Sequence, residues 1–270
     1  MKLPTPNVHH PRSKERLDVA LASRKLVASR SQAESFVRLG QVKVNGKVAK
    51  KAGQLVSSED KIEVTAGQQY VSRAALKLKS ADEAFHIDWR DKTVLDVGSS
   101  TGGFTQYALL HGAAKVIAVD VGTDQLHPSL RNDPRIELHE KTDIRDVWLR
   151  QTESRGMSHE SRQKAVFLDP EIDIVVGDVS FISLREILPA VSRLLNLDSR
   201  LVVMVKPQFE AGQSDFKHKG VIKNDRMRRD ILKDFELWAG KYFHVLGKKD
   251  SEVAGSKGNV ERFYLLKKVK

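Results

Sequence analysis

The pattern of apolar and polar residues changes near residue 70, and the part before it has two helical stretches. Apolar side chains recur at helical spacing across residues 15–39, which predicts amphipathic helices. Ser31 is followed three residues later by Glu34, the spacing of a capping box, and glycine, here Gly40, is common just after a helix end. We therefore expect a helix to begin just after Ser31 and to end before Gly40.

The same part of the chain then changes to strand-like alternation. Residues 41–51 alternate around the dipeptide Asn45-Gly46, which is a strong signal for a hairpin. Residues 61–64 have the pattern of a closing strand. Two helices and a small sheet within residues 1–65 predict a small α+β domain.

From Val71 onward, long helical patterns alternate with short apolar runs. The predicted strands are residues 93–98, 115–120, 135–140, 172–178 and 201–205. This alternation is typical of a parallel sheet with helices wound around it. Ligands of such sheets bind beyond the carboxyl ends of the strands, so the residues that end each strand are the first candidates for a site.

The last of these strands runs directly into a lysine. The segment LVVMVKPQFE, residues 201–210, places Lys206 after five apolar residues and before Pro207, which is expected to end the strand. A buried strand rarely ends on an ammonium group unless the protein uses the charge. Lys206 is therefore a candidate functional residue at the carboxyl edge of the sheet.

Composition limits the functions that these elements can have. Hydrophobic residues make up 40% of the 270 residues, enough for a core, and there is no cysteine. Disulfides, thiolate metal sites and methyltransferases with a cysteine nucleophile are thereby excluded, and no metal site is expected. No apolar run approaches the roughly 18 residues that span a bilayer, and the N-terminus lacks a signal-peptide pattern. We expect a cytoplasmic protein without a membrane partner.

The positive charge is concentrated in the first domain. The chain has a net charge of +11, and residues 1–65 carry 13 Lys and Arg against 6 Asp and Glu. That asymmetry is typical of a surface that binds nucleic acid or an anionic membrane. The basic residues expected to meet phosphates are Arg24, Lys25, Arg30, Arg38 and Lys43.

A glycine-rich turn, DVGSSTGGFT at residues 96–105, follows the first predicted strand of the second part. Glycines let the backbone approach a ligand closely, and the following helix N-terminus offers free N–H groups. The turn lacks the lysine of a P-loop and the strict spacing of a dinucleotide motif. The residues expected to contact the ligand here are Asp96, Gly98, Ser99, Ser100, Thr101, Gly102, Gly103 and Phe104.

Two aspartates extend this candidate site. Asp120 ends the second strand, where a carboxylate can accept hydrogen bonds from a ribose diol. Asp143 follows the third strand and is placed to reach an adenine amino group. With the glycine turn, these residues favour a cofactor that contains adenosine, and the arrangement favours S-adenosylmethionine over NAD.

Residues 16–64 resemble the S4-like RNA-binding domain, which occurs in a ribosomal protein and in many RNA-modifying enzymes. The features SRSQA, G-x-V-x-VNG and D-x-I-x-V occur here in that order, and the resemblance implies structured RNA as the partner. Arg16-Leu17-Asp18 also matches the tripeptide that carries the catalytic aspartate of some pseudouridine synthases. Here it is expected instead to begin a helix, with Asp18 in the first turn.

Six further segments, in order, resemble the haemolysin A (TlyA) family, in which an S4-like domain is fused to an FtsJ-like ribose 2′-O-methyltransferase. They are YVSRAALKL, LDVGSSTGGFT, AVDVGTDQLHPSLRNDPR, GDVSFISL, LVVMVKPQFEAG and GSKGNVERFYLL. The resemblance implies a Rossmann-like class I methyltransferase, an α/β fold with a mostly parallel seven-stranded sheet and helices on both faces, at residues 72–270. A linker at 66–71 would join it to the S4-like domain at 1–65. The stretch 147–170 is longer than the family pattern.

The resemblance also implies a catalytic tetrad of Lys77, Asp178, Lys206 and Glu261, with Asp178 at the cofactor as well. A ribose hydroxyl is a weak nucleophile, so the enzyme has to orient it, remove its proton and hold it in line with the methyl group. Lys206 is expected to meet the hydroxyl. Two roles are compatible with the residues: a neutral Lys206 would take the proton, and a charged one would steer the oxygen.

The leading hypothesis is a monomeric ribose 2′-O-methyltransferase that uses S-adenosylmethionine and acts on ribosomal RNA in ribosomal subunits, by resemblance on cytidine. One alternative is a haemolysin, the activity for which the family is named. Such a protein should have an amphipathic or apolar membrane segment, and none is visible. The other alternative is an RNA-binding protein with an inactive methyltransferase domain. The intact tetrad positions and glycine turn count against it.

Overall fold

The computed structural model divides the chain into two units, residues 1–69 and 70–270. It describes residues 14–27, 30–38, 40–65, 70–150, 165–169, 171–213, 220–253, 255 and 258–270. Most of the predicted linker, 66–69 of residues 66–71, lies outside the described residues.

The first unit contains two short helices and five short strands among its described residues. In chain order they are β1 (Glu15–Arg16), α1 (Leu17–Ser23), α2 (Arg30–Arg38), β2 (Val42–Val44), β3 (Lys47–Val48), β4 (Leu55–Val56) and β5 (Ile62–Val64). β2 lies between β3 and β5 in an antiparallel sheet, and β1 pairs with β4. Both helices contribute to one small apolar core, with Leu21 from α1 and Phe36 from α2.

The local predictions for this unit had different outcomes. The hairpin is confirmed: Asn45 and Gly46, between β2 and β3, have φ values of 51° and 77°, as a two-residue turn of this kind requires. Gly40 follows α2 with a φ of 69°, as expected after a helix end. The predicted helix start is wrong. α2 already includes Arg30, so Ser31 lies inside the helix rather than before it. The guanidinium of Arg30 lies 3.1 Å from Asp18 Oδ2.

Asp18 has a structural role, as the sequence predicted. It lies in the first turn of α1, is fully buried, and pairs with the guanidinium groups of Arg16 and Arg30 at 3.0 and 3.1 Å. Hydrogen bonding from Arg16, aided by Arg30, holds the pKa of the Asp18 carboxyl far below its ordinary value. A buried carboxylate that two arginines neutralise stabilises this unit and does not form a pseudouridine synthase site.

The second unit contains a large sheet, a separate pair of strands and five α-helices among its described residues. Its strands are β6 (Thr93–Val97), β7 (Lys115–Val119), β8 (Ile136–His139), β9 (Val147–Leu149), β10 (Val166–Leu168), β11 (Ile174–Gly177), β12 (Arg200–Val205), β13 (Phe243–Asp250) and β14 (Arg262–Lys268). Its helices are α3 (Ala74–Phe85), α4 (Gly103–Leu110), α6 (Leu184–Leu194), α7 (Pro207–Glu210) and α8 (Asp225–Ala239), with 3-10 turns η1 (Ile144–Asp146) and η3 (Ala211–Gln213).

Seven strands form the sheet in the order β13-β14-β12-β11-β6-β7-β8. The strands from β12 to β8 are parallel, and β14 is antiparallel to both of its neighbours. The mostly parallel seven-stranded fold is thus confirmed, and all five predicted strand segments belong to it. Strand order reverses between β6 and β11, and ligands of such sheets bind at that reversal.

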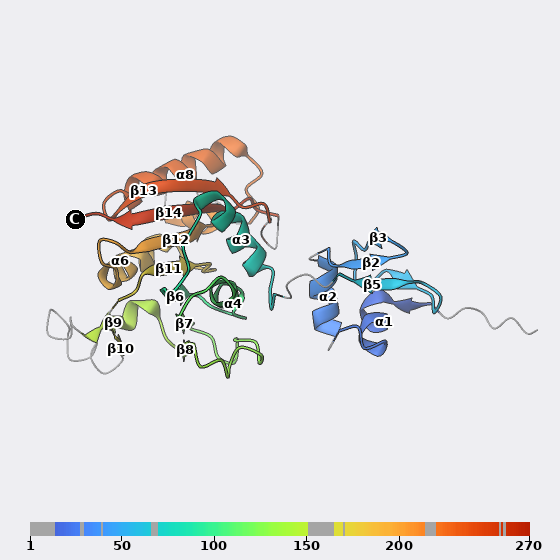
Figure 1. The fold of residues 1–270 in the computed structure, drawn as a ribbon. Coiled ribbons are helices and arrows are strands. Elements are labelled where there is room, and N and C mark those ends of the chain that lie inside the picture. Colours follow the sequence, from blue (N-terminus) through green and yellow to red (C-terminus); the bar gives the residue numbers. More distant parts are fainter. Residues whose placement is uncertain are drawn as a thin grey trace, which may run out of the picture. The chain divides into compact units, whose positions relative to one another are not determined.

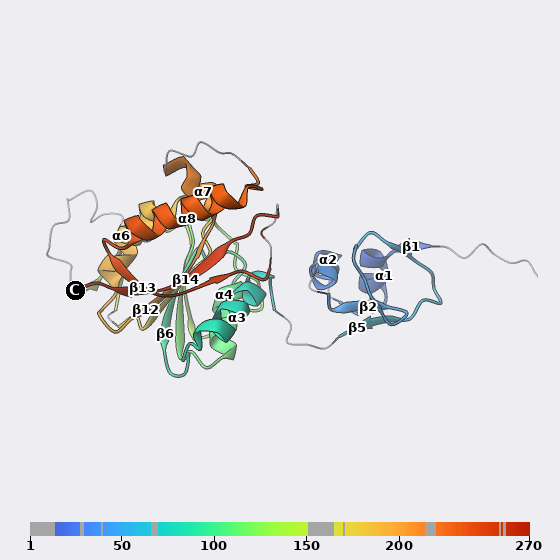
Figure 2. The same cartoon turned by 90° about the horizontal axis from the view of Figure 1, so that it is seen from above.

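Helices cover both faces of this sheet. Leu95 and Val203 pack on one face with side chains of α6 and α8. Val94 and Met204, their chain neighbours, pack on the other face with side chains of α3 and α4. Figures 1 and 2 show the two pairs of helices on opposite sides of the strands. Because both faces are covered, the central strands are continuous apolar runs, as the sequence shows.

No helix in the described parts of the chain is both long and apolar enough to cross a membrane.

Candidate active site

A cavity of about 1070 Å³ lies at the carboxyl ends of β6, β7, β11 and β12 in the second unit. Segments at the ends of these strands line it, together with the N-terminal part of α3 and residues just before β14. Ordinary small-molecule pockets are roughly 300–1,000 Å³. The cavity is therefore large enough for a cofactor together with part of a second ligand.

The glycine turn lies where the sequence predicted, between β6 and α4. Asp96, Gly98, Ser99, Ser100, Thr101 and Phe104 line the cavity. Gly98 has a φ of 78°, and a Cβ there would approach Val179 Cγ1 to 3.1 Å. The following helix, α4, begins at Gly103, so its unpaired N–H groups lie beside this wall.

Gly102 and Gly103 do not line the cavity, and packing within the protein explains why they are glycine. Gly102 has a φ of 87°, and a Cβ there would lie 2.6 Å from side-chain atoms of Leu126 and Leu130. A Cβ on Gly103 would meet the Ser72 hydroxyl and would lie 2.9 Å from Ala74 Cβ. These two glycines allow close packing of the turn and α4 against neighbouring segments.

The carboxylate of Asp120 is fixed in an orientation that suits a diol ligand. Its carboxylate accepts hydrogen bonds from the backbone N–H groups of Ser100 and Gly122, at 2.8 and 2.7 Å, one on each oxygen. Each oxygen of a carboxylate can accept more than one hydrogen bond, so both can still bind a hydroxyl group. Asp120 lines the cavity beside the glycine turn, as the sequence predicted for a ribose contact.

Asp143 also lines the cavity, but much of its hydrogen-bonding capacity is used within the chain. It caps η1 by accepting from Arg145 N, and it pairs with the Arg145 guanidinium at 2.6 Å. Hydrogen bonding from Arg145 lowers the pKa of the Asp143 carboxyl. An adenine amino group would therefore share this carboxylate with Arg145.

Asp96 is the most buried charged group of the cavity wall. It is 1% exposed and accepts a 2.6 Å hydrogen bond from Thr105 Oγ1. Burial raises the pKa of the Asp96 carboxyl to about 7, against the opposing effect of the Thr105 hydrogen bonds. The wall beside the glycine turn thus carries a carboxyl group that titrates near neutral pH.

Four side chains from separate elements meet at another part of the cavity. Lys77 comes from α3, Asp178 follows β11, Lys206 follows β12 and Glu261 precedes β14. Lys206 Nζ lies 2.7 Å from Asp178 Oδ1, while Lys77 Nζ lies 2.6 Å from Glu261 Oε2 and 3.8 Å from Asp178 Oδ2. None of the four side chains is more than 15% exposed. Residues far apart in the sequence thus form one connected set of alternating charges.

The strand that leads to Lys206 ends where the sequence predicted. Lys206 follows β12 directly and precedes Pro207, which also starts a short helix, α7. Proline suits the first helical position because its missing N–H would have no partner there. The strand thus passes into a helix, with Lys206 at the junction.

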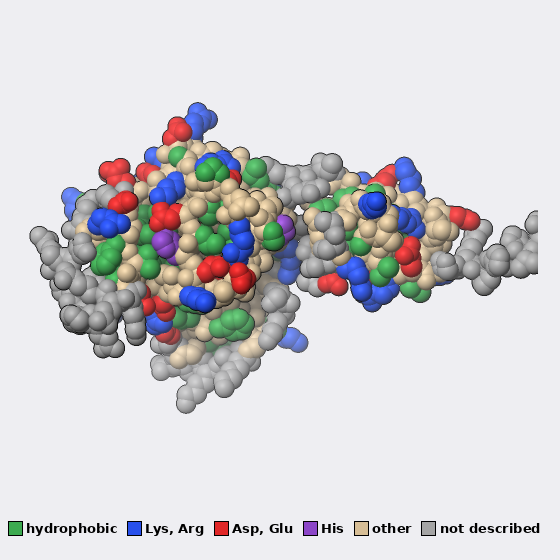
Figure 3. All heavy atoms as spheres, turned by 90° about the horizontal axis from the view of Figure 1, so that it is seen from below, with side chains coloured by type: hydrophobic (Ala, Val, Ile, Leu, Met, Phe, Trp, Pro, Cys, Tyr) green, Lys and Arg blue, Asp and Glu red, His purple; other side chains and the backbone are tan. Residues whose placement is uncertain are grey.

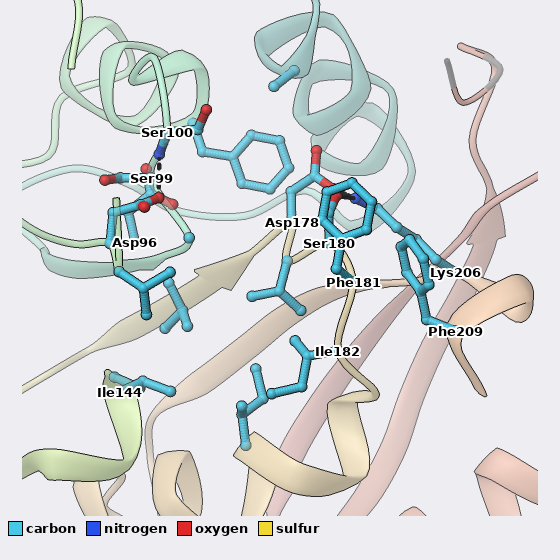
Figure 4. Close-up of a pocket in the computed structure, with 18 of the residues that line it drawn as sticks. Asp96, Ser99, Ser100, Ile144, Asp178, Ser180, Phe181, Ile182, Lys206 and Phe209 are labelled. Carbon is cyan, nitrogen blue, oxygen red and sulfur yellow. Dashed lines mark hydrogen bonds and ion pairs between the residues drawn. The ribbon is translucent and has the colours of Figure 1, made fainter. Parts of the chain in front are cut away.

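Other residues that line this part of the cavity were not predicted as site residues. Ser180, Phe181 and Phe209 lie beside Asp178 and Lys206 (Figure 4). Phe181 is 92% exposed and has a φ of 68°, and its ring lies 5.6 Å from that of Phe209. The sequence shows an aromatic residue within the motif GDVSFISL, but its exposure depends on the conformation of the loop.

Four buried polar atoms of the cavity wall have no hydrogen-bond partner among the described residues. They are Ser72 Oγ, Ser99 Oγ, Gln208 Oε1 and Asp178 Oδ1, of which the last lies in an ion pair with Lys206. Buried polar groups in proteins are almost always hydrogen-bonded. A polar ligand in the cavity would supply the missing partners.

The basic residues predicted to bind RNA have different surroundings in the first unit. Arg24 donates hydrogen bonds to the backbone carbonyls of Ser57 and Asp60, and Arg30 is paired with Asp18. Lys25 is exposed and Lys43 is half-buried, whereas the side chain of Arg38 is outside what the structure describes.

Several exposed lysines of the same unit were not predicted. They are Lys47, Lys50 and Lys51. Figure 3 shows basic side chains at several places on the visible face of this unit, with acidic ones between them. Exposed lysines thus lie beside the predicted residues as further candidates for phosphate contacts.

Sequence comparisons place each unit in a known family. A model of FtsJ-like methyltransferases matches residues 70–268, and a model of the S4 domain matches residues 15–62. These ranges correspond to the two units of the structure.

Proteins of similar length resemble the whole chain. The 16S/23S rRNA (cytidine-2′-O)-methyltransferase TlyA of Mycobacterium tuberculosis is 38% identical over 255 residues, which cover 93% of this chain and 89% of that protein. Hemolysin A of Brachyspira hyodysenteriae is 38% identical over 248 residues, covering 91% and 97%. A solved structure from Streptococcus thermophilus is 32% identical, covers 96% of this chain and 90% of its own, and superposes with a TM-score of 0.66.

Proposed function

This chain belongs to the FtsJ-like methyltransferase family, and from that premise we propose that it transfers a methyl group from S-adenosylmethionine to the ribose 2′-hydroxyl of a cytidine in ribosomal RNA. The observation that carries the proposal is the connected set of Lys77, Asp178, Lys206 and Glu261 beside the glycine turn. The relative named as an rRNA (cytidine-2′-O)-methyltransferase supports the substrate. The S4 domain supports RNA as the partner.

The cavity wall fits S-adenosylmethionine at two positions. Asp120 has free capacity on both carboxylate oxygens for the ribose diol. Ser72 Oγ and Ser99 Oγ are buried, have no hydrogen-bond partner in the part of the chain that the structure describes, and can hydrogen-bond the polar amino-acid part. The buried carboxyl of Asp96 lines the cavity as well. The sulfonium of this cofactor supplies an activated methyl group.

The tetrad would act on the ribose hydroxyl. Lys206 Nζ is the group proposed to meet the 2′-oxygen: when protonated it donates to the oxygen, and when neutral it can accept the hydroxyl proton. Asp178 holds Lys206 in place, and Lys77, fixed by Glu261, compensates the charge of Asp178 on its other side. Fixing the hydroxyl in line with the methyl group is the main contribution required, because the methyl donor is already reactive.

Phe181 and Phe209 support a nucleotide as the second ligand. Their rings lie at the cavity, and Phe181 is almost fully exposed in spite of its apolar side chain. Nucleotide bases that leave a stack commonly bind by stacking on such aromatic rings. The rings would hold the target base while its ribose faces Lys206.

A methylation assay with a matched pair of lysine variants tests this function. Purified protein is incubated with methyl-labelled S-adenosylmethionine and separate ribosomal subunits, and the label is mapped by nucleotide analysis. We expect 2′-O-methylcytidine with the wild type and with Lys79→Met, but at least a hundredfold less with Lys77→Met. Lys79 lies on the same helix, α3, but is half-exposed and pairs with Glu83 on the surface.

Absence of label in RNA, under conditions where the cofactor binds, would contradict the proposed activity. Label on a base would contradict the ribose as acceptor.

A further inference from the structure

Lys206 has a second polar partner besides Asp178. Its Nζ donates a 2.6 Å hydrogen bond to Ser180 Oγ and lies 2.7 Å from Asp178 Oδ1. The hydroxyl is the acceptor here because a lysine ammonium group has only donors. Figure 4 shows the three side chains together, with Phe181 next to them.

Two partners orient the nitrogen in a way that one partner cannot. The hydrogen bond to Ser180 Oγ fixes one donor direction of the nitrogen, while Asp178 Oδ1 holds its charge at ion-pair distance. With Asp178 alone, the flexible lysine side chain could turn about a single contact. With both partners the nitrogen is confined, and it lines the cavity where a ligand would bind.

The loop that carries Ser180 is itself held in place. It connects β11 to α6 and turns at Phe181, whose φ of 68° is unusual for a residue other than glycine. At its far end, Glu210 of α7 accepts hydrogen bonds from Ser183 Oγ at 2.6 Å and from Leu184 N at 2.8 Å. The loop and the segment 206–210 are thus joined at both ends.

We propose that Ser180 is a positioning residue that aims Lys206 Nζ at the ribose hydroxyl, a role that rests on the methyltransferase function proposed above. The charged groups that act on this nitrogen are Asp178 directly and, beyond it, Lys77 from α3 and Glu261 from the segment before β14. Ser180 is uncharged, so it sets direction without changing the charge balance of this set.

Two variants of equal shape test the proposal. Ser180→Thr keeps a hydroxyl, whereas Ser180→Val has the same branched outline without one. For each we would measure kcat, the KM for ribosomal subunits, the dissociation constant of S-adenosylmethionine and the melting temperature. Ser180 is exposed, so neither change should prevent folding, which circular dichroism would check.

We expect Ser180→Thr to stay within about threefold of the wild type, and Ser180→Val to lose kcat by about 10- to 100-fold with little change in KM or cofactor affinity. A merely structural role would instead raise KM, weaken cofactor binding or lower the melting temperature together with kcat, and would affect Ser180→Thr as much as Ser180→Val.

Equal kcat values for the two variants would overturn the proposal. So would a Ser180→Ala variant that behaves like the wild type. If the wild-type protein itself did not methylate RNA, the proposed function would be contradicted instead. Failure of the Ser180 proposal and failure of the proposed function are therefore distinguishable.

Discussion

Asp96 shows how a single buried carboxyl can make the protein sensitive to pH. Burial raises the pKa of this group to about 7 in the folded protein, from an ordinary value of 3.8. A group whose pKa is raised on folding adds stability below its unfolded value, and that stability is lost as the pH rises through the folded value. Between pH 4 and 7, ionisation of Asp96 therefore lowers the free energy of unfolding by up to about 1.4 kcal/mol per pH unit.

The Asp96→Asn variant tests this effect. Asparagine cannot ionise but keeps an oxygen that can accept from Thr105 Oγ1. We expect the melting temperature of the variant relative to the wild type to rise from pH 5 to pH 8, as measured by scanning calorimetry. Parallel melting-temperature curves for the two proteins would show that Asp96 does not titrate in this range.

At the scale of single residues, the sequence was informative where function coincides with a strand end. Lys206, Asp178 and Asp120 could be predicted because each follows an apolar run whose length and composition mark a buried strand. Ser180 and Phe181 could not, because their orientation depends on a loop with a left-handed residue at Phe181. Apolar periodicity carries no information about such a loop.

At the scale of elements, the packing of α4 against α3 depends on Gly103. A methyl group there would meet the Ser72 hydroxyl and lie 2.9 Å from Ala74 Cβ, much closer than ordinary contacts. Alanine would otherwise be favoured over glycine within a helix by about 1 kcal/mol. The steric effect and the helix propensity therefore oppose each other at this position.

We expect the Gly103→Ala variant to be destabilised by about 1–3 kcal/mol, because overpacking outweighs helix propensity. Gly212→Ala is the control, since a Cβ there meets no atom within 4 Å and the φ is not positive. It should change the free energy of unfolding by less than about 0.5 kcal/mol. If denaturant titrations gave the two variants the same free energy of unfolding, α3 and α4 would be able to move apart without loss of stability.

The last two strands of the sheet explain why its antiparallel part was not predicted in full. The pairing of β13 with β14 shifts register between Val245 and Gly247, which interrupts the alternation of side chains. β13 is also an edge strand, and only one of its eight residues is buried. By contrast, β11 (Ile174–Gly177) is buried at every residue and is visible in the sequence as a continuous apolar run.

At the scale of the whole molecule, net charge and local structure give different information about RNA binding. The excess of basic residues in the first unit could be read from the sequence, but their individual roles could not. Arg24 and Arg30 are used to hold this unit together, through Ser57, Asp60 and Asp18. Ion pairing and capping of carbonyls depend on contacts between distant parts of the chain, which composition does not reveal.

The exposed lysines Lys47, Lys50 and Lys51 of the first unit are therefore the better candidates for phosphate contacts. Each phosphate contact contributes about 0.7–0.9 to the slope of log affinity against log salt. Replacing all three lysines with alanine should raise the KM for ribosomal subunits, reduce the size of that slope by about 2, and leave kcat and the melting temperature nearly unchanged.

A control variant that loses the same charge in the second unit distinguishes the effect of local phosphate contacts from the effect of the protein's net charge. The control replaces three exposed lysines there with alanine, namely Lys233, Lys241 and Lys270. If binding depended only on overall charge, both triple variants would lower the slope alike, since steering by the field of the whole protein does not distinguish the units. If the first unit contacts the phosphates, only its own variant should lower the slope, as measured from KM at several salt concentrations. Equal slopes in the two variants would contradict direct contacts by these three lysines.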